Sequence, residues 1–286
     1  MIRANLPGMP PFRRFDGRVA RGVPAYRRMI PFLMRGKNES AVLFEQTVDL
    51  SSTLPWLEQR NRDADDHATF FHLLLAALGR VLHERPRLNR FVSGRKLHDR
   101  DGVYISFAAK KRMDDDAPLS VVKRRFAADE SFDDVVAALH GGIDEARSDR
   151  ASSVDKEVGL LLRLPAPVLD GAVRLVRALD AVNLAPRALL EHDPMYTSVF
   201  VANLGSLRID AAYHHLYEYG NCPLFCTLGR IEQMPMVVGD GQLEARWGVK
   251  LKFTYDERIE DGHYAAQAIA RLCDYLEAPA SWAGGL

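Results

Sequence analysis

The sequence predicts an α/β protein in which a sheet is flanked by helices, and two patterns carry this prediction. Residues 248–255 alternate the apolar side chains of Val249, Leu251 and Phe253 with polar ones, which is typical of a half-buried strand. Residues 69–84 instead repeat their apolar side chains at helical spacing and stop just before a proline, which a helix interior does not accommodate.

The composition indicates a globular chain without an electrostatic partner. Its 286 residues are 47% hydrophobic, which suffices for one large domain or two small ones. The 38 basic and 38 acidic residues cancel, so we expect no nucleic-acid partner. No apolar stretch reaches the ~18–20 residues of a membrane span, and the N-terminus has no signal-peptide core. We therefore expect a cytoplasmic protein with no membrane partner.

Cysteine usage indicates neither disulfides nor a metal. The 3 cysteines are too few for a disulfide framework. Cys222 and Cys226 lie in an apolar run without further ligands nearby, which favours core thiols. We therefore expect no metal site.

The chain divides into an arm and one domain. Residues 1–25 are rich in Pro, Gly and Arg and predict an extended N-terminal arm, whereas residues 26–286 predict a single catalytic-type domain. The expected helices cover residues 26–34, 54–60, 69–84, 132–147, 168–182 and the stretch around 269–276, and the expected strands cover 41–48, 103–109, 119–126, 198–203, 224–231 and 248–255. Ser131 is the expected N-cap of the helix at residues 132–147, and residues 239–241 read as a hairpin turn.

A leucine-rich stretch at about residues 155–192 leaves three interpretations open. Its second half predicts a helix at residues 168–182 with a wide apolar face and a thin polar stripe. Such a helix can pack inside the molecule or between subunits, form the wall of an acyl-chain pocket, or lie on a membrane surface. The packing interpretation is favoured, and the membrane one is disfavoured because the stripe is not strongly basic.

A charged turn at residues 254–262 joins the last predicted strand to the last helix. Taken alone, its five charged residues indicate either a solvated turn or a rigid edge at which a site is built. The turn resembles the Asp-His-Arg-x-x-Asp-Gly signature of the dihydrolipoyl acyltransferase catalytic domains of 2-oxoacid dehydrogenase complexes. Four signature positions match, namely Asp256, Arg258, Asp261 and Gly262, and Glu257 stands where the signature has its histidine.

Three further stretches resemble the same family in the same order. Residues 85–91 are similar to its His-Pro-x-Leu-Asn segment, residues 198–206 to its Phe-Thr-Ile-Thr-Asn-Leu-Gly-Ser strand and turn, and residues 224–231 to the strand that follows. The resemblance covers about residues 26–280, with residues 155–192 as a helical insertion. It implies a two-layer chloramphenicol acetyltransferase-like fold with a mixed sheet, assembled as a homotrimer. We find no lipoyl-type module in the sequence.

The resemblance implies acyl transfer from acyl-CoA or another acyl thioester. Carried over by position, the catalytic residues are Glu257, Asp261 and the nearby His263, with Arg27 or Arg28 as the arginine that pairs with Asp261. Asn203, Ser206 and Arg258 are the expected residues for binding coenzyme A.

Two chemical groups of the family's site are missing at once. Glu257 replaces the histidine base, and a carboxylate is a weaker base than imidazole. Ala202 stands at the position of the hydroxyl that stabilises the oxyanion. Losing a base costs about 100–10,000-fold in rate and losing an oxyanion donor about 100–1,000-fold.

Other residues could replace the missing groups, and the function therefore has two interpretations. His263, His214 or His215 could act as the base, and Ser198 or Ser206 could supply a hydroxyl. The sequence predicts a stand-alone acyltransferase with a degenerate motif or, as the alternative, a catalytically inactive trimeric binding or scaffold protein of the same fold.

Overall fold

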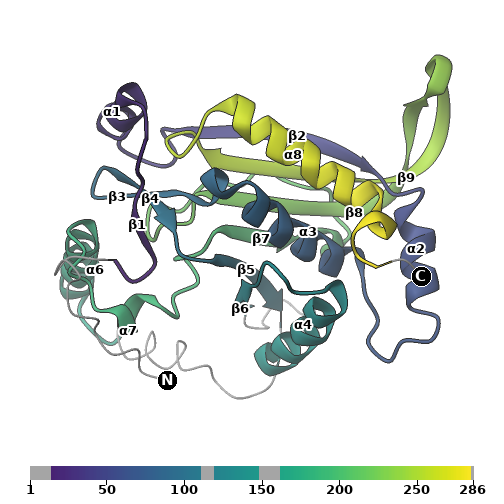
Figure 1. Ribbon diagram of the computed structural model, residues 1–286. Coiled ribbons are helices and arrows are strands. Elements are labelled where there is room, and N and C mark those ends of the chain that lie inside the picture. The colour runs from purple at the N-terminus through teal and green to yellow at the C-terminus, as the bar shows by residue number, and fades with distance from the viewer. Residues whose placement is uncertain (1–13, 111–118, 148–161, 285–286) are drawn as a thin grey trace.

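The computed structural model describes residues 14–110, 119–147 and 162–284 (Figure 1). Residues 1–13 of the predicted arm and residues 155–161 of the predicted insertion lie outside these ranges. The division into arm, domain and insertion stays a prediction. No helix within the described ranges is long and apolar enough to cross a membrane.

The centre of the fold is a six-stranded sheet with the strand order β2-β9-β8-β7-β5-β6. β7 runs parallel to β5 and β8, and the other neighbours are antiparallel, so the predicted mixed sheet is confirmed. The strands are β2 (Ala41–Asp49), β5 (Val103–Lys110), β6 (Leu119–Phe126), β7 (Val199–Asn203), β8 (Leu224–Val238) and β9 (Gln242–Asp256).

Helices cover one face of this sheet (Figure 1). They are α2 (Thr53–Arg60), α3 (Phe70–Glu84), α4 (Phe132–Arg147) and α8 (Gly262–Glu277), and α3 and α8 pack side by side. Their apolar faces form the main core with the sheet, in which Leu73, Leu74 and Leu276 are fully buried. The predicted N-cap of α4 is confirmed, since Ser131 Oγ accepts a hydrogen bond from the N–H of Asp134 at 3.2 Å.

The loop of residues 204–223 lies over the opposite face. Thr227 Oγ1 donates to the carbonyl of Ala212 at 2.7 Å, and Thr254 Oγ1 donates to that of His214 at 2.6 Å. Beneath the loop, Phe200 and Phe225 stack in a second, smaller apolar cluster. The sheet therefore has a helical layer on one side and an aromatic loop on the other.

A second, three-stranded sheet has the order β1-β4-β3 and lies beside α1 and α6 (Figure 1). The sequence did not predict its strands β1 (Gly17–Val19), β3 (Phe91–Ser93) and β4 (Lys96–Arg100) because they are too short to show alternation. The helices and short 3₁₀ turns around it and elsewhere are α1 (Ala25–Leu33), α6 (Ala166–Ala181), α7 (Arg187–Leu190), η1 (Pro86–Asn89), η2 (Gly205–Leu207) and η4 (Pro279–Ser281).

The predicted helix at residues 168–182 is α6, and it is attached chiefly at its C-terminal end. None of its residues is buried, but Asp180 forms an ion pair with Arg14 at 2.8 Å. Gly94 approaches Ala181 so closely that a Cβ would lie 2.1 Å from its carbonyl oxygen.

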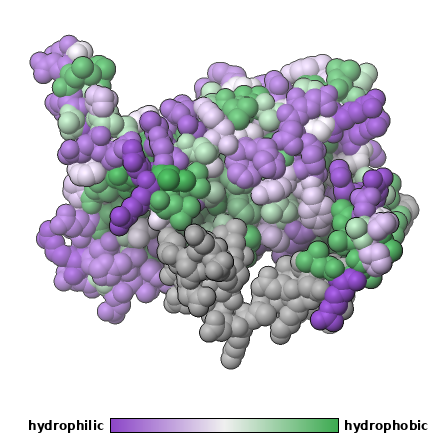
Figure 2. Space-filling model, turned by 180° about the vertical axis from the view of Figure 1, so that it is seen from behind, coloured by the Kyte–Doolittle hydropathy of each residue, from purple (hydrophilic) through white to green (hydrophobic). Residues whose placement is uncertain are grey.

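The hairpin of β8 and β9 is longer than predicted and projects from the body as an arm. The predicted turn is confirmed, since η3 (Gly239–Gly241) joins the two strands. β8 continues through Pro235, which is tolerated because β7 pairs with β8 only as far as Leu228, leaving the outer edge of β8 open beyond it. Val237 and Leu243 are 72% and 71% exposed on this hairpin arm, which carries hydrophobic surface where it projects in Figure 2.

Candidate active site divided between two ends of the sheet

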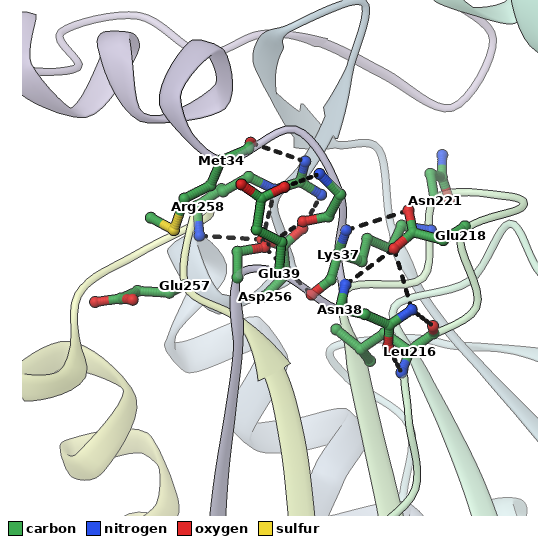
Figure 3. A network of polar contacts seen from close by, with 12 residues as sticks. Met34, Lys37, Asn38, Glu39, Leu216, Glu218, Asn221, Asp256, Glu257 and Arg258 are labelled. Atoms are coloured by element: carbon green, nitrogen blue, oxygen red, sulfur yellow. Dashed lines mark hydrogen bonds and ion pairs between the residues drawn. The ribbon is translucent and has the colours of Figure 1, made fainter.

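A buried ion pair locks the turn that follows β9. Arg258 donates from Nε and Nη2 to the two oxygens of Asp256 at 2.8 and 2.7 Å, and both residues are under 5% exposed. Ser40 Oγ donates to the same carboxylate at 2.9 Å, and Arg258 Nη1 donates to the carbonyl of Arg35 at 2.9 Å (Figure 3). The geometry is the two-pronged form that makes guanidinium–carboxylate pairs strong.

Glu257 lies between these two residues with a fixed backbone and a free side chain. Its N–H donates to the carbonyl of Ser40 at 2.9 Å, and its own carbonyl accepts from Arg27 Nη1 at 3.2 Å. Its carboxylate has no hydrogen bond or ion pair within the described residues and points away from the network around Arg258 (Figure 3). The half-buried carboxylate is therefore available to a ligand or a proton.

Arg27 is the arginine that reaches the turn, whereas Arg28 is exposed. The distance from Arg27 to the predicted partner, Asp261, is 3.9 Å, but Glu260 is closer at 3.7 Å. Glu260 is 2% exposed and also receives Arg87 and Arg90 from the segment around η1, both at 3.3 Å. The sequence did not identify this residue, although three arginines in residues 85–90 signal a buried anion nearby.

Asp261 caps the helix that follows the turn. Its Oδ1 accepts from the N–H of Tyr264 at 2.9 Å, and this hydrogen bond, with the charges of Arg27 and Arg87, holds its pKa below the usual value. His263 is exposed one residue beyond Gly262. Glu257, Asp261 and His263 therefore lie at one end of β9, as their spacing predicts.

Lys37 ties the loop over the sheet to the same turn. Its Nζ is buried and donates to the carbonyls of Tyr217 and Gly220 at 2.8 and 2.7 Å. Burial lowers the pKa of this amine to about 8, partly offset by nearby carboxylates. Asn38 and Glu218 extend the network (Figure 3).

Asn203 and Ser206 lie at the opposite end of the sheet. They line a groove between the start of α3 and the turn after β7, together with Phe71, Arg208 and Arg230. Asn203 Oδ1 accepts from the N–H of Ser206 at 3.1 Å, and Ser206 Oγ donates to the carbonyl of Asn203 at 2.7 Å.

Within one chain, the turn that carries Glu257 and the turn that carries Asn203 lie far apart. Asn203 is level with Leu228 of β8, and Leu228 is level with Leu251 of β9. The five residue steps from Leu251 to Asp256 span about 17 Å at the rise of a strand. Within one chain, Glu257 and the Asn203 turn therefore cannot act on the same bond.

The structure rules out one of the alternative hydroxyls and places the two histidines in a stack. Ser198 is fully buried, and its Oγ accepts from the N–H of Tyr104, so it cannot meet a substrate. His214 stacks on Phe225 at 3.9 Å and on His215 at 4.7 Å, and burial lowers its pKa. No group of three potential metal ligands occurs among the described residues.

The mixed sheet and its helical layer define a chloramphenicol acetyltransferase-like fold. Residues 185–283 match the family model described as the catalytic domain of 2-oxoacid dehydrogenase acyltransferases. This match agrees with the resemblance drawn from the sequence over that part of the chain.

A known protein shows the same resemblance. Over 136 residues the chain is 30% identical to the dihydrolipoyllysine-residue acetyltransferase component of the pyruvate dehydrogenase complex of Mycoplasma capricolum subsp. capricolum. That match covers 44% of this chain and only 29% of the relative, so the chain spans less than a third of the relative's length.

Solved structures share the fold over nearly the whole chain. A probable dihydrolipoamide acetyltransferase from Listeria monocytogenes superposes with a TM-score of 0.61 at 16% identity, covering 92% of this chain and 94% of its own. The dihydrolipoamide acetyltransferase of Azotobacter vinelandii gives 0.58 at 20% identity, with 90% and 88% covered. A chloramphenicol acetyltransferase gives 0.57 at 12% identity, with 91% and 99% covered. At these identities the likeness concerns the fold alone.

Proposed function

We propose that this chain transfers an acyl group from acyl-CoA or another acyl thioester, at a site shared between neighbouring copies of a homotrimer. The observation that carries the proposal is the Glu257 turn, in which a buried ion pair and two backbone hydrogen bonds hold a carboxylate that has no partner among the described residues. A fixed, unpaired acid or base is what proton transfer in catalysis requires. The match to an acyltransferase family supports the reaction type.

Each site residue receives a role from its surroundings. Glu257 takes the proton of the attacking thiol or hydroxyl, and Asp261 holds the turn as the helix cap and as a partner of Arg27. His263 is exposed nearby and is the second candidate for the proton acceptor. The guanidinium of Arg258 binds Asp256 and the carbonyl of Arg35 inside the protein. We therefore assign Arg258 to the architecture of the turn and not to the binding of coenzyme A.

An inactive trimeric scaffold of the same fold is the second candidate. It is favoured by one observation, namely that Ala202 offers no hydroxyl for an oxyanion. The scaffold keeps the buried pair of Asp256 and Arg258 for stability and does not use Glu257.

Thiol release from a panel of acyl-CoA substrates of different chain length tests the proposal. We expect turnover by the purified protein and a loss of about 100–10,000-fold in Glu257→Gln, which keeps the shape and removes the base. Full turnover in the Glu257→Gln variant together with loss in His263→Gln assigns the base to His263. No release by a folded wild-type oligomer over the whole panel contradicts the enzyme and leaves the scaffold.

A further inference from the structure

The groove beside the turn after β7 contains a fixed hydrogen-bond donor that could replace the missing hydroxyl. We infer that the side-chain amide of Asn203 stabilises the oxyanion of the acyl transfer, and this inference rests on the proposed acyltransferase function. Ala202 cannot serve, because its side chain has no donor and packs against the cluster of Phe200 and Phe225. The donor must therefore come from another residue at this end of the sheet.

Most polar side chains that line the groove already have partners. The hydroxyl of Ser206 donates to the carbonyl of Asn203 at 2.7 Å. Thr69 Oγ1 lies 2.8 Å from His72 Nδ1 in the capping box of α3. Arg230 is paired with Glu232 at 2.8 Å. Within the described part of the chain, the side-chain donors of the groove without a partner are Nδ2 of Asn203, the guanidinium of Arg208 and the two terminal nitrogens of Arg230.

The amide of Asn203 is already oriented. Its Oδ1 accepts from the N–H of Ser206 at 3.1 Å, which fixes that end of the side chain against the turn. Both N–H bonds of Nδ2 are thereby left for a ligand in the groove. Arg208 and Arg230 are both exposed on long side chains, and ordering either of them costs more side-chain entropy than using the short amide.

The backbone beneath the amide is rigid. A Cβ at Gly205 would lie 2.4 Å from the carbonyl oxygen of Gly229, so the turn is packed directly onto β8. The N–H of Leu204 donates to the carbonyl of Leu228 at 2.9 Å. A donor that needs no rearrangement during the reaction is the kind that stabilises developing charge most effectively.

The proposed step is balanced without a further reactant. The acceptor's sulfur or oxygen attacks the thioester carbonyl carbon and forms a new bond, while its proton passes to Glu257 of the neighbouring copy. The carbonyl electron pair moves to the oxygen, and Nδ2 of Asn203 donates a hydrogen bond to this oxyanion. The tetrahedral intermediate then re-forms the carbonyl and breaks the original carbon–sulfur bond, and the departing thiolate recovers the proton.

An isosteric substitution tests the inference. Asn203→Asp keeps an acceptor for the N–H of Ser206 but replaces the two donors with negative charge. We expect kcat to fall by about 100–1,000-fold, with KM changed by less than about threefold, because the lost contact is made in the transition state. Gln59→Glu, an exposed site on α2, adds the same charge and should leave turnover and thermal stability as they are.

The outcomes separate this inference from the proposed function. Unchanged kcat in Asn203→Asp, or a rise in KM alone, overturns the role of the amide while the enzyme stands. Absence of turnover by the wild-type protein overturns the proposed function itself. If Asn203→Asp does not fold, Asn203→Ala removes the same donor without adding charge, and it must show the same fall in kcat.

Discussion

Glu257 shows how neighbouring residues prepare a side chain for chemistry without touching it. Asp256 and Arg258 satisfy each other in the interior, and breaking a buried pair of this kind leaves an uncompensated charge at a cost of about 3–5 kcal/mol. The two residues therefore hold the turn tightly. The backbone of Glu257 between them is therefore fixed, while its carboxylate has no partner in the described part of the chain.

Buried histidines make the protein sensitive to acid. His98 stacks on Phe91 with its ring 5.1 Å away and is 2% exposed, and burial together with the charge of Arg14 lowers its pKa to about 4. Its Nε2 has no hydrogen-bond partner among the described residues. His98 of the unfolded chain thus binds a proton near pH 6.5, whereas His98 of the folded chain binds a proton only near pH 4. The free energy of unfolding must fall as the pH drops through this window, in which His72 adds to the effect.

The variant His98→Phe tests this dependence. It keeps the stacked ring and cannot bind a proton, so we expect its free energy of unfolding to fall less steeply from pH 6.5 to pH 4 than that of the wild type. Denaturant unfolding at several pH values measures the slope. His67→Asn, at an exposed position, is the control that should keep the wild-type slope. An equal slope in His98→Phe would show that His98 does not carry the effect.

At the residue scale, the sequence predicts local contacts and misses distant ones. The cap by Ser131 and the charged turn follow from patterns along the chain. The partners of Glu260 do not, because Arg27, Arg87 and Arg90 come from segments that only the tertiary fold brings together. For the same reason, the sequence does not predict which carbonyls accept hydrogen bonds from Lys37.

At the scale of elements, prediction succeeds where one pattern is long enough. α3, β5 and β6 were predicted to within one residue because each repeats its period several times. The hairpin arm was underestimated because Pro235 reads as a strand end, although an unpaired edge tolerates it. The short strands β1 and β3 exist only through their pairing with β4.

The hairpin arm is the element most dependent on a neighbour. A two-stranded ribbon is marginal in water by itself, and this one exposes the cross-strand pair Val237 and Leu243. If the arm packs on another copy, the double variant Val237→Asp, Leu243→Asp should shift the oligomer to a smaller species at micromolar concentration. Light scattering after size exclusion measures the mass. Gln242→Glu, at the tip of the arm, is the matched control. An unchanged mass of the double variant would exclude the arm from the interface.

At the scale of the whole molecule, the sheet separates the two halves of the site. The register places Glu257 and Asn203 at opposite ends of β9 and β7, about 17 Å apart along the strands. No sequence pattern gives this distance, since it depends on the order of strands in the sheet. A cyclic assembly in which one end of each copy meets the other end of the next would complete the site at every interface.

The most direct test of this account mixes two inactive variants. Glu257→Gln and Asn203→Asp, carrying different affinity tags, are co-expressed in equal amounts and the mixed oligomers are purified through both tags. If each site takes Glu257 from one copy and Asn203 from the next, one of the three interfaces in every mixed trimer holds both intact residues, and about a third of wild-type turnover returns. Mixed oligomers that form but remain as inactive as either parent would contradict the shared site.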